Sequence, residues 1–210
     1  MSSKPIQAWH FVKDNRAILH LHHGKEVKIR KGLVLTCDPD RLEMLRYGLH
    51  ASENIIDALC HAPGSVICRV ECSGSWVKSD DKLVCSERRV LWWINVEHIL
   101  HEFACRCAER AINRVKLNDP VFADAIKAKR KWLKKQISDD ELAAAGATAW
   151  EAARVAAWEA ARETAREAAW AAAGAAAWDA ERKWQSRCLT QMVYAENVLK
   201  DLEVATNGEG

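Results

Sequence analysis

The chain has 210 residues, a formal net charge of +2, eight cysteines and ten tryptophans. A net charge this close to zero excludes the strongly basic surface typical of proteins that bind nucleic acids or acidic membranes, and no apolar run reaches the roughly 18 residues of a membrane-spanning helix. The first residues lack the apolar segment of a signal peptide, so we expect a cytoplasmic protein with reduced cysteines.

Residues 1–94 are predicted to form an α+β domain around a small mixed or antiparallel sheet. Alternating apolar and polar residues mark the strands, and the first two strands are expected to pair as a hairpin across Asp14-Asn15. Ser52 is expected to cap a helix that Pro63-Gly64 ends. The expected strands are 6–12, 17–22, 27–35 with a break at 31–32, 65–73, 82–84 and 89–94, with a strand or turn at 47–51; the expected helices are 39–46 and 53–61.

The rest of the chain is predicted to be helical. Residues 95–137 are expected to form two connecting helices, the second of which begins at Asp119-Pro120. Ser138 and Glu141 form a capping box, so a long helix followed by a C-terminal helix is predicted over 138–204. Residues 205–210 are expected to be a frayed tail.

The long helix contains a four-residue repeat rich in Ala, Glu and Arg from Trp150 to Arg187. Because an α-helix has 3.6 residues per turn, each repeat advances by roughly 40°, and the Ala pairs wind around the helix. Arg and Trp four residues apart can stack as cation–π pairs. A solvated single helix is the alternative, but so many tryptophans favour an interaction surface and a homo-oligomer. The residues expected to form this interaction helix are Trp150, Arg154, Trp158, Arg162, Arg166, Trp170 and Trp178.

No metal site and no nucleic-acid site are predicted. His98, His101 and Cys105 share one helix face, but no Cys-x-x-Cys pair accompanies them. The basic residues between Lys127 and Lys135 spread over more than half of a helix circumference, as they do on a solvated face.

The order Gly48-Leu49-His50-Ala51-Ser52, a helix, a Val-rich strand and Glu87-Arg88 before a Val-Leu strand forms one further pattern. It resembles the ADP-ribosyltransferase-like fold, which holds a nicotinamide dinucleotide in a cleft between two small sheets. The resemblance implies that His10 holds the ribose, Ser52 supplies a hydroxyl and Glu87 is the catalytic carboxylate, with NAD as cofactor. Phe11 stands where the family has Gly, and Cys85-Ser86 replaces the Glu-x-Glu or Gln-x-Glu form, as expected of a member that keeps the cleft without the reaction.

The Gly48–Asn54 stretch, the strand after it and the Ala-rich, Trp-bearing tail are together similar to uncharacterised bacteriophage and prophage proteins. This resemblance implies expression in a host bacterial cytosol. By analogy at the level of class, it also implies a counter-defence factor.

The sequence therefore leaves three functions open. The first is a non-enzymatic protein without a cofactor that binds and sequesters a nucleotide-like ligand and oligomerises through its tail. The second is a module that docks on a host protein through the interaction helix, and the third is an ADP-ribosyltransferase-like enzyme. The residues expected to bind the ligand are His10, His50, Ser52, Arg69 and Arg88.

Overall fold

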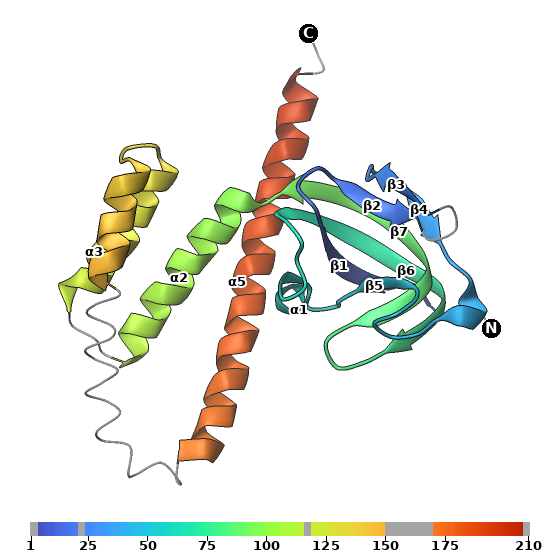
Figure 1. The fold of residues 1–210 in the computed structure, drawn as a ribbon, viewed down its shortest axis with the longest axis horizontal. Coiled ribbons are helices and arrows are strands. Elements are labelled where there is room, and N and C mark those ends of the chain that lie inside the picture. Colours follow the sequence, from blue (N-terminus) through green and yellow to red (C-terminus); the bar gives the residue numbers. More distant parts are fainter. Residues whose placement is uncertain (1–3, 21–23, 116–118, 150–169, 208–210) are drawn as a thin grey trace. The chain divides into compact units, whose positions relative to one another are not determined.

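The computed structural model describes residues 4–20, 24–115, 119–149 and 170–207. It confirms an α+β protein with an antiparallel sheet of five strands and a helical C-terminal part (Figure 1). Contacts divide the chain into a sheet unit, Met1–Glu97 with Ser186–Gly210, and a helical unit, His98–Gln185.

The sheet is built on a long hairpin of β6 (Val66–Lys78) and β7 (Leu83–Asn95). β1 (Ile6–Val12) pairs with β6, while β4 (Val34–Thr36) and β5 (Leu49–Ala51) both pair with β7, all antiparallel. The two strands predicted at 82–84 and 89–94 are thus one strand. The residues between them stay in the ladder, because Cys85 pairs with Trp76 and Glu87 with Ser73.

A bulge bends this hairpin between Ser73 and Trp76. Gly74 has φ +74°, and a β-carbon there would overlap the Ser86 hydroxyl. That hydroxyl accepts a hydrogen bond from the backbone N–H of Ser75 at 3.0 Å. The bulge therefore lets β6 continue past residue 73, where the sequence predicted that its main run ends.

The predicted pairing of the first two strands is wrong. β2 (Ala17–His20) pairs with β3 (Lys25–Lys28) in a separate two-stranded sheet. β1 is hydrogen-bonded along its whole length to β6 instead. Alternation along β1 marks a strand but carries no information about its partner, which lies more than fifty residues away in the sequence.

The two predicted helices of this domain are shorter than expected. Only a 3-10 turn forms at Pro39–Arg41, and helix α1 covers Ile55–Leu59. Its N-cap is Asn54, whose side chain accepts from the Ile56 N–H at 2.9 Å, rather than Ser52. Ser52 instead forms an isolated backbone bridge with Trp9.

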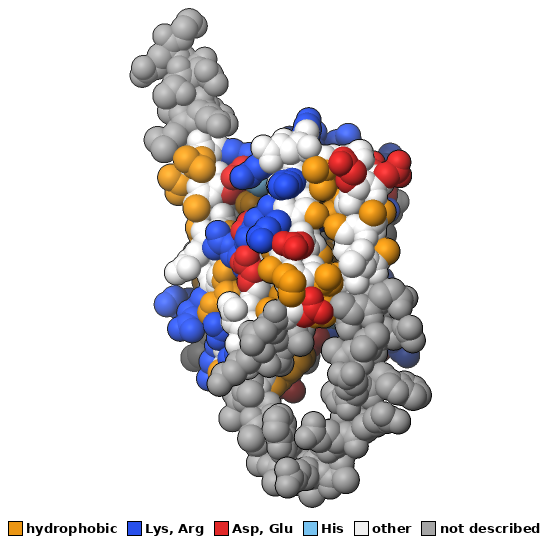
Figure 2. All heavy atoms as spheres, turned by 90° about the vertical axis from the view of Figure 1, so that its left-hand side faces the viewer, with side chains coloured by type: hydrophobic (Ala, Val, Ile, Leu, Met, Phe, Trp, Pro, Cys, Tyr) orange, Lys and Arg blue, Asp and Glu red, His pale blue; other side chains and the backbone are white. Residues whose placement is uncertain are grey.

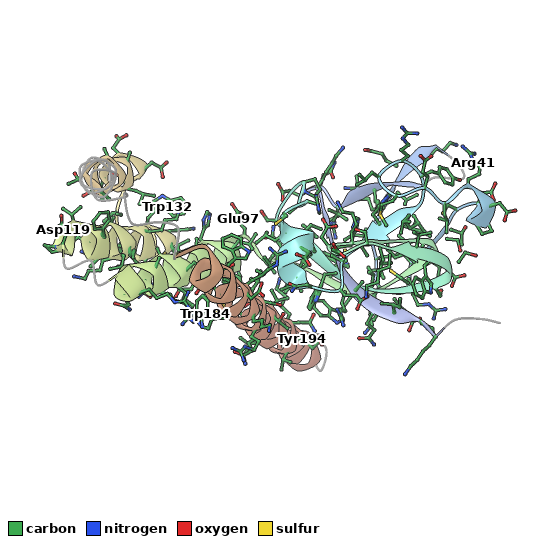
Figure 3. All side chains as sticks on the ribbon, turned by 90° about the horizontal axis from the view of Figure 1, so that it is seen from below. Arg41, Glu97, Asp119, Trp132, Trp184 and Tyr194 are labelled. Atoms are coloured by element: carbon green, nitrogen blue, oxygen red, sulfur yellow. The ribbon has the colours of Figure 1, made fainter. Side chains whose placement is uncertain are left out.

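Helix α5 (Trp170–Asn207) contributes its second half to the sheet unit. Leu189 and Val193 are fully buried there. Tyr194, labelled in Figure 3, makes edge contacts with the rings of Trp9 and Trp92, with both pairs of ring centroids 5.6 Å apart. These aromatic contacts cover the face of β1 opposite Ala8 and Val12, which belong to the main apolar core.

The helical unit contains most of α2 (Glu97–Val115), α3 (Pro120–Leu133) and helical residues 139–149. The predicted caps at Asp119 and Ser138 are both present. Arg130 of α3 forms ion pairs with Glu102 and Glu109 of α2. Figure 2 shows basic and acidic side chains intermixed on the face it draws. None of the described helices is long and apolar enough to cross a bilayer.

The buried side of α5 gives a test of its place in the sheet unit. We expect Leu189→Ala to lower the free energy of unfolding by about 2–5 kcal/mol, because the removed side chain is completely buried. Leu199→Ala, on the same helix at an exposed position, should change it by less than about 1 kcal/mol. Urea unfolding followed by tryptophan fluorescence measures both. Equal effects of the two substitutions would contradict this packing.

Candidate functional site

A cavity opens in the sheet unit where β1 and β5 come together. β1 meets the residue that follows β5 at the Trp9–Ser52 bridge, in which Trp9 N donates to Ser52 O at 2.7 Å and Ser52 N donates to Trp9 O at 3.0 Å. Beside this bridge lies a cavity of about 260 Å³, which we call the histidine pocket. It is lined by Trp9, His10, Phe11, Leu45, His50, Ala51, Ser52, Ala58, His61 and Lys82.

Three residues that the sequence singled out line this pocket together. His10 comes from β1, His50 from β5, and Ser52 follows β5 directly. Arg88 lies behind the wall, because its Nη1 donates a hydrogen bond to the backbone oxygen of His50. Arg88 is only 2% exposed.

Arg69 and Glu87 lie outside the pocket lining. The Arg69 guanidinium stacks over the Trp9 ring, 4.6 Å from its centroid, and donates to Gln7 Oε1 at 3.1 Å. Glu87 Oε1 accepts from the Ser73 hydroxyl at 3.1 Å. The structure therefore does not bring the predicted catalytic carboxylate to the histidines.

His50 is held as a neutral imidazole. The backbone N–H of Leu45 donates to its Nε2 at 3.0 Å, and because an amide N–H can only donate, Nε2 carries no proton. Burial lowers the pKa of His50, and the charge of Arg88 lowers it further, against a hydrogen bond to the Gly48 backbone. Position 48 requires glycine, because its φ is +129° and a β-carbon there would overlap the Val84 side chain.

His10 is also neutral at pH 7. Burial holds the pKa of its imidazole well below the usual value, and the charge of Arg88 acts in the same direction. None of the hydrogen bonds among the described residues involves its ring. A neutral ring of this kind can donate through one nitrogen and accept through the other.

Sequence reasoning missed two of the pocket's polar residues, His61 and Lys82. Lys82 Nζ lies 3.2 Å from His61 Nε2 and 3.2 Å from Asp81 Oδ2. Burial acts to raise the pKa of Asp81, but the hydrogen bonds to His61, Lys82 and Ser79 together outweigh it and hold that pKa at about 2. Both residues lie just outside regular elements, in segments with no recognisable motif, so no local signal marks them.

The candidate metal ligands and the described part of the interaction helix predicted from the sequence do not contribute to the histidine pocket. Within the described residues, no group of three His, Cys, Asp or Glu side chains is arranged to hold a metal ion. The ring of His101 packs edge-on against Trp132. Of the interaction helix, Trp150, Arg154, Trp158, Arg162 and Arg166 lie outside the described residues, Trp170 begins α5, and Trp178 is 68% exposed.

Comparison of the chain with protein-family models, with curated proteins and with solved structures finds no match. The resemblances to the ADP-ribosyltransferase-like fold and to bacteriophage proteins therefore stay predictions.

The two neutral histidines predict how stability depends on pH. Because their pKa values are lower in the folded chain than the ~6.5 of an unfolded one, the unfolded chain binds protons first as the pH falls. The free energy of unfolding should therefore decrease from pH 7.5 to pH 5.5, by up to about 1.4 kcal/mol per pH unit for each histidine.

Urea unfolding across this range measures the slope, and His10→Gln should make it shallower. The range lies above the lowered pKa values of Asp81, Glu102 and Glu141, so these carboxylates contribute little to it. Unchanged stability between pH 7.5 and pH 5.5 would show that the two imidazoles take up protons as easily as exposed ones.

Proposed function

We propose that this protein binds a small nucleotide-like ligand in the histidine pocket and does not transform it. The observation that carries the proposal is that His10, His50 and Ser52 line one cavity together with Lys82. Neutral imidazoles suit the hydroxyl and ring-nitrogen groups of a nucleoside, while Lys82 suits its phosphate. A small number of convergent polar groups in a largely apolar pocket is typical of ligand-binding sites.

The size of the pocket limits the ligand. Its volume of about 260 Å³ lies just below the roughly 300–1,000 Å³ of cavities that enclose drug-sized molecules. A single nucleotide or a smaller metabolite is therefore a better fit than a complete dinucleotide.

The composition of the lining favours binding over group transfer. None of the residues that line the pocket is an Asp or a Glu, and ADP-ribosyl transfer by the mechanism that the resemblance implies needs a carboxylate beside the ribose. The proposal of a sequestering, counter-defence role in a bacterial cytosol rests on the resemblance of residues 48–54 and of the tail to bacteriophage proteins.

Ligand titrations test the proposal. We expect adenosine monophosphate or a related mononucleotide to bind saturably in isothermal titration calorimetry. At a hundred times its dissociation constant it should add about 2.7 kcal/mol to the free energy of unfolding. Lys82→Met should weaken binding about ten- to a hundred-fold, because it removes a charged hydrogen-bond donor from the lining.

Lys78→Met is the matched control. Lys78 lies on the same hairpin, forms an ion pair with Glu53 at 2.6 Å and lines a neighbouring cavity that shares only Lys82 with the histidine pocket. This variant should bind with unchanged affinity, as should Glu87→Gln. The absence of a thermal shift with nucleosides, mononucleotides, ADP-ribose and cyclic dinucleotides would remove the proposal.

A second candidate is a protein-interaction role for α5, favoured by the 68% exposure of the large Trp178 side chain. On this reading, copies of the chain associate through the Trp and Arg residues of the interaction helix. Light scattering after size exclusion at micromolar concentration should give an oligomer, and Trp178→Ala should reduce its mass. A strict monomer would contradict self-association.

A further inference from the structure

Arg88 is a buried cation with an incomplete set of partners. Its side chain donates to the backbone oxygen of His50, but its Nε has no hydrogen-bond partner. Among the described residues, no Asp or Glu forms an ion pair with it. A buried guanidinium without a counter-charge is costly, so an anion bound beside it would reduce that cost.

The thiols of four cysteines act electrostatically on Arg88. Burial lowers the pKa of the Arg88 guanidinium. The nearby thiols act in the opposite direction; they belong to Cys72, Cys85, Cys68 and Cys37. Burial raises the pKa of Cys37 and raises that of Cys68 to about 12, so these two stay protonated. Cys72, which is the cross-strand partner of Arg88, has its pKa lowered by a hydrogen bond with Cys85. The cluster therefore contains one thiol that can compete with an external anion.

Arg88 lies behind the wall of the histidine pocket at His50, the side that we call its inner end. His50, whose carbonyl it contacts, lines that pocket, and the charge of Arg88 also acts on the ring of His10. His10 belongs to the same strand face as the core residues Ala8 and Val12, so its ring is directed to the inner side of the sheet. Arg88 is thus bonded to the backbone of one pocket histidine and acts electrostatically on the ring of the other.

From this arrangement we infer that the inner end of the histidine pocket is an oxyanion site, in which a terminal phosphate or carboxylate of the ligand enters beside His10 and neutralises Arg88. The inference rests on the proposed function and adds an orientation to it, with the anionic group inward and the rest of the ligand toward Leu45 and His61. It selects molecules that end in an oxyanion. Dinucleotides, whose phosphates are flanked on both sides, do not fit it.

Inorganic phosphate and acetate are the probes, because each presents the oxyanion without the rest of a ligand. We expect saturable binding of at least one of them to the full chain, measured by calorimetry and by thermal shift. Tighter binding of phosphate identifies a phosphate monoester as the ligand class, and tighter binding of acetate identifies a carboxylate. The same probe should compete with adenosine monophosphate in the calorimeter.

Arg88→Met should lose at least ten-fold in affinity for the probe, while its melting temperature is equal to or higher than that of the wild type, because an uncompensated charge is removed. Arg69→Met is the matched control. Arg69 lies on the neighbouring strand β6 and, like Arg88, has an unpartnered Nε and is not itself a lining residue, but its guanidinium stacks on the Trp9 ring and donates to Gln7 rather than to His50. Its substitution should leave probe affinity unchanged. If Arg88→Met does not fold, Arg88→Lys takes its place and should retain part of the probe affinity. The competition between the probe and adenosine monophosphate is measured on the wild type and depends on neither variant.

Several results would overturn the inference. Retention of probe affinity by Arg88→Met would do so, as would binding of adenosine as tight as that of its monophosphate, a result that leaves the proposed function intact. If the wild-type protein binds neither nucleosides nor nucleotides nor anions, both proposals are removed. An unresponsive wild type combined with a strongly destabilised Cys72→Ala would assign the counter-charge to Cys72 instead.

Discussion

The sheet unit depends on the pairing between β6 and β7. Each strand is 13 residues long, and every other strand of the five-stranded sheet is hydrogen-bonded to one of these two. Because β1 attaches to β6 and β5 attaches to β7, the bend of the hairpin decides whether these outer strands approach each other. The bulge at Gly74 permits that bend. The Trp9–Ser52 bridge is the point at which β1 and the end of β5 then meet. The histidine pocket lies beside that bridge.

Local features of the fold could be predicted from the sequence, while the pairings could not. Alternation placed β1 correctly at Ile6–Val12, and capping chemistry placed the start of α3 and of the helix after Ser138. The capping residue of α1 was misplaced by two positions, because Ser52 and Asn54 offer the same side-chain chemistry and only the Trp9 bridge separates their roles. The partner of β1 depends on contacts across more than fifty residues, which no local pattern encodes.

For the candidate site, too, some residues could be identified from the sequence and others could not. His10, His50 and Ser52 were chosen on a resemblance, and all three line the pocket. Arg69 was chosen with them, although alternation on β6 already set it apart: Cys68, Val70 and Cys72 are apolar and buried, which places Arg69 on the opposite face. His61 and Lys82 lie outside the strands and α1, and only tertiary structure brings them to the cavity.

The backbone at Leu45 couples the entrance of the pocket to the ionisation of one ring. Leu45 has φ +69°, a left-handed conformation that is unfavourable for a side chain with a β-carbon, and its N–H is bonded to Nε2 of His50. A proton on Nε2 turns that acceptor into a donor, so the bond to the Leu45 amide cannot persist. The loop at the entrance then loses the interaction that offsets its strain. Because this bond needs an unprotonated nitrogen, we expect protonation of His50 to weaken the attachment of the Leu45 loop to the pocket wall.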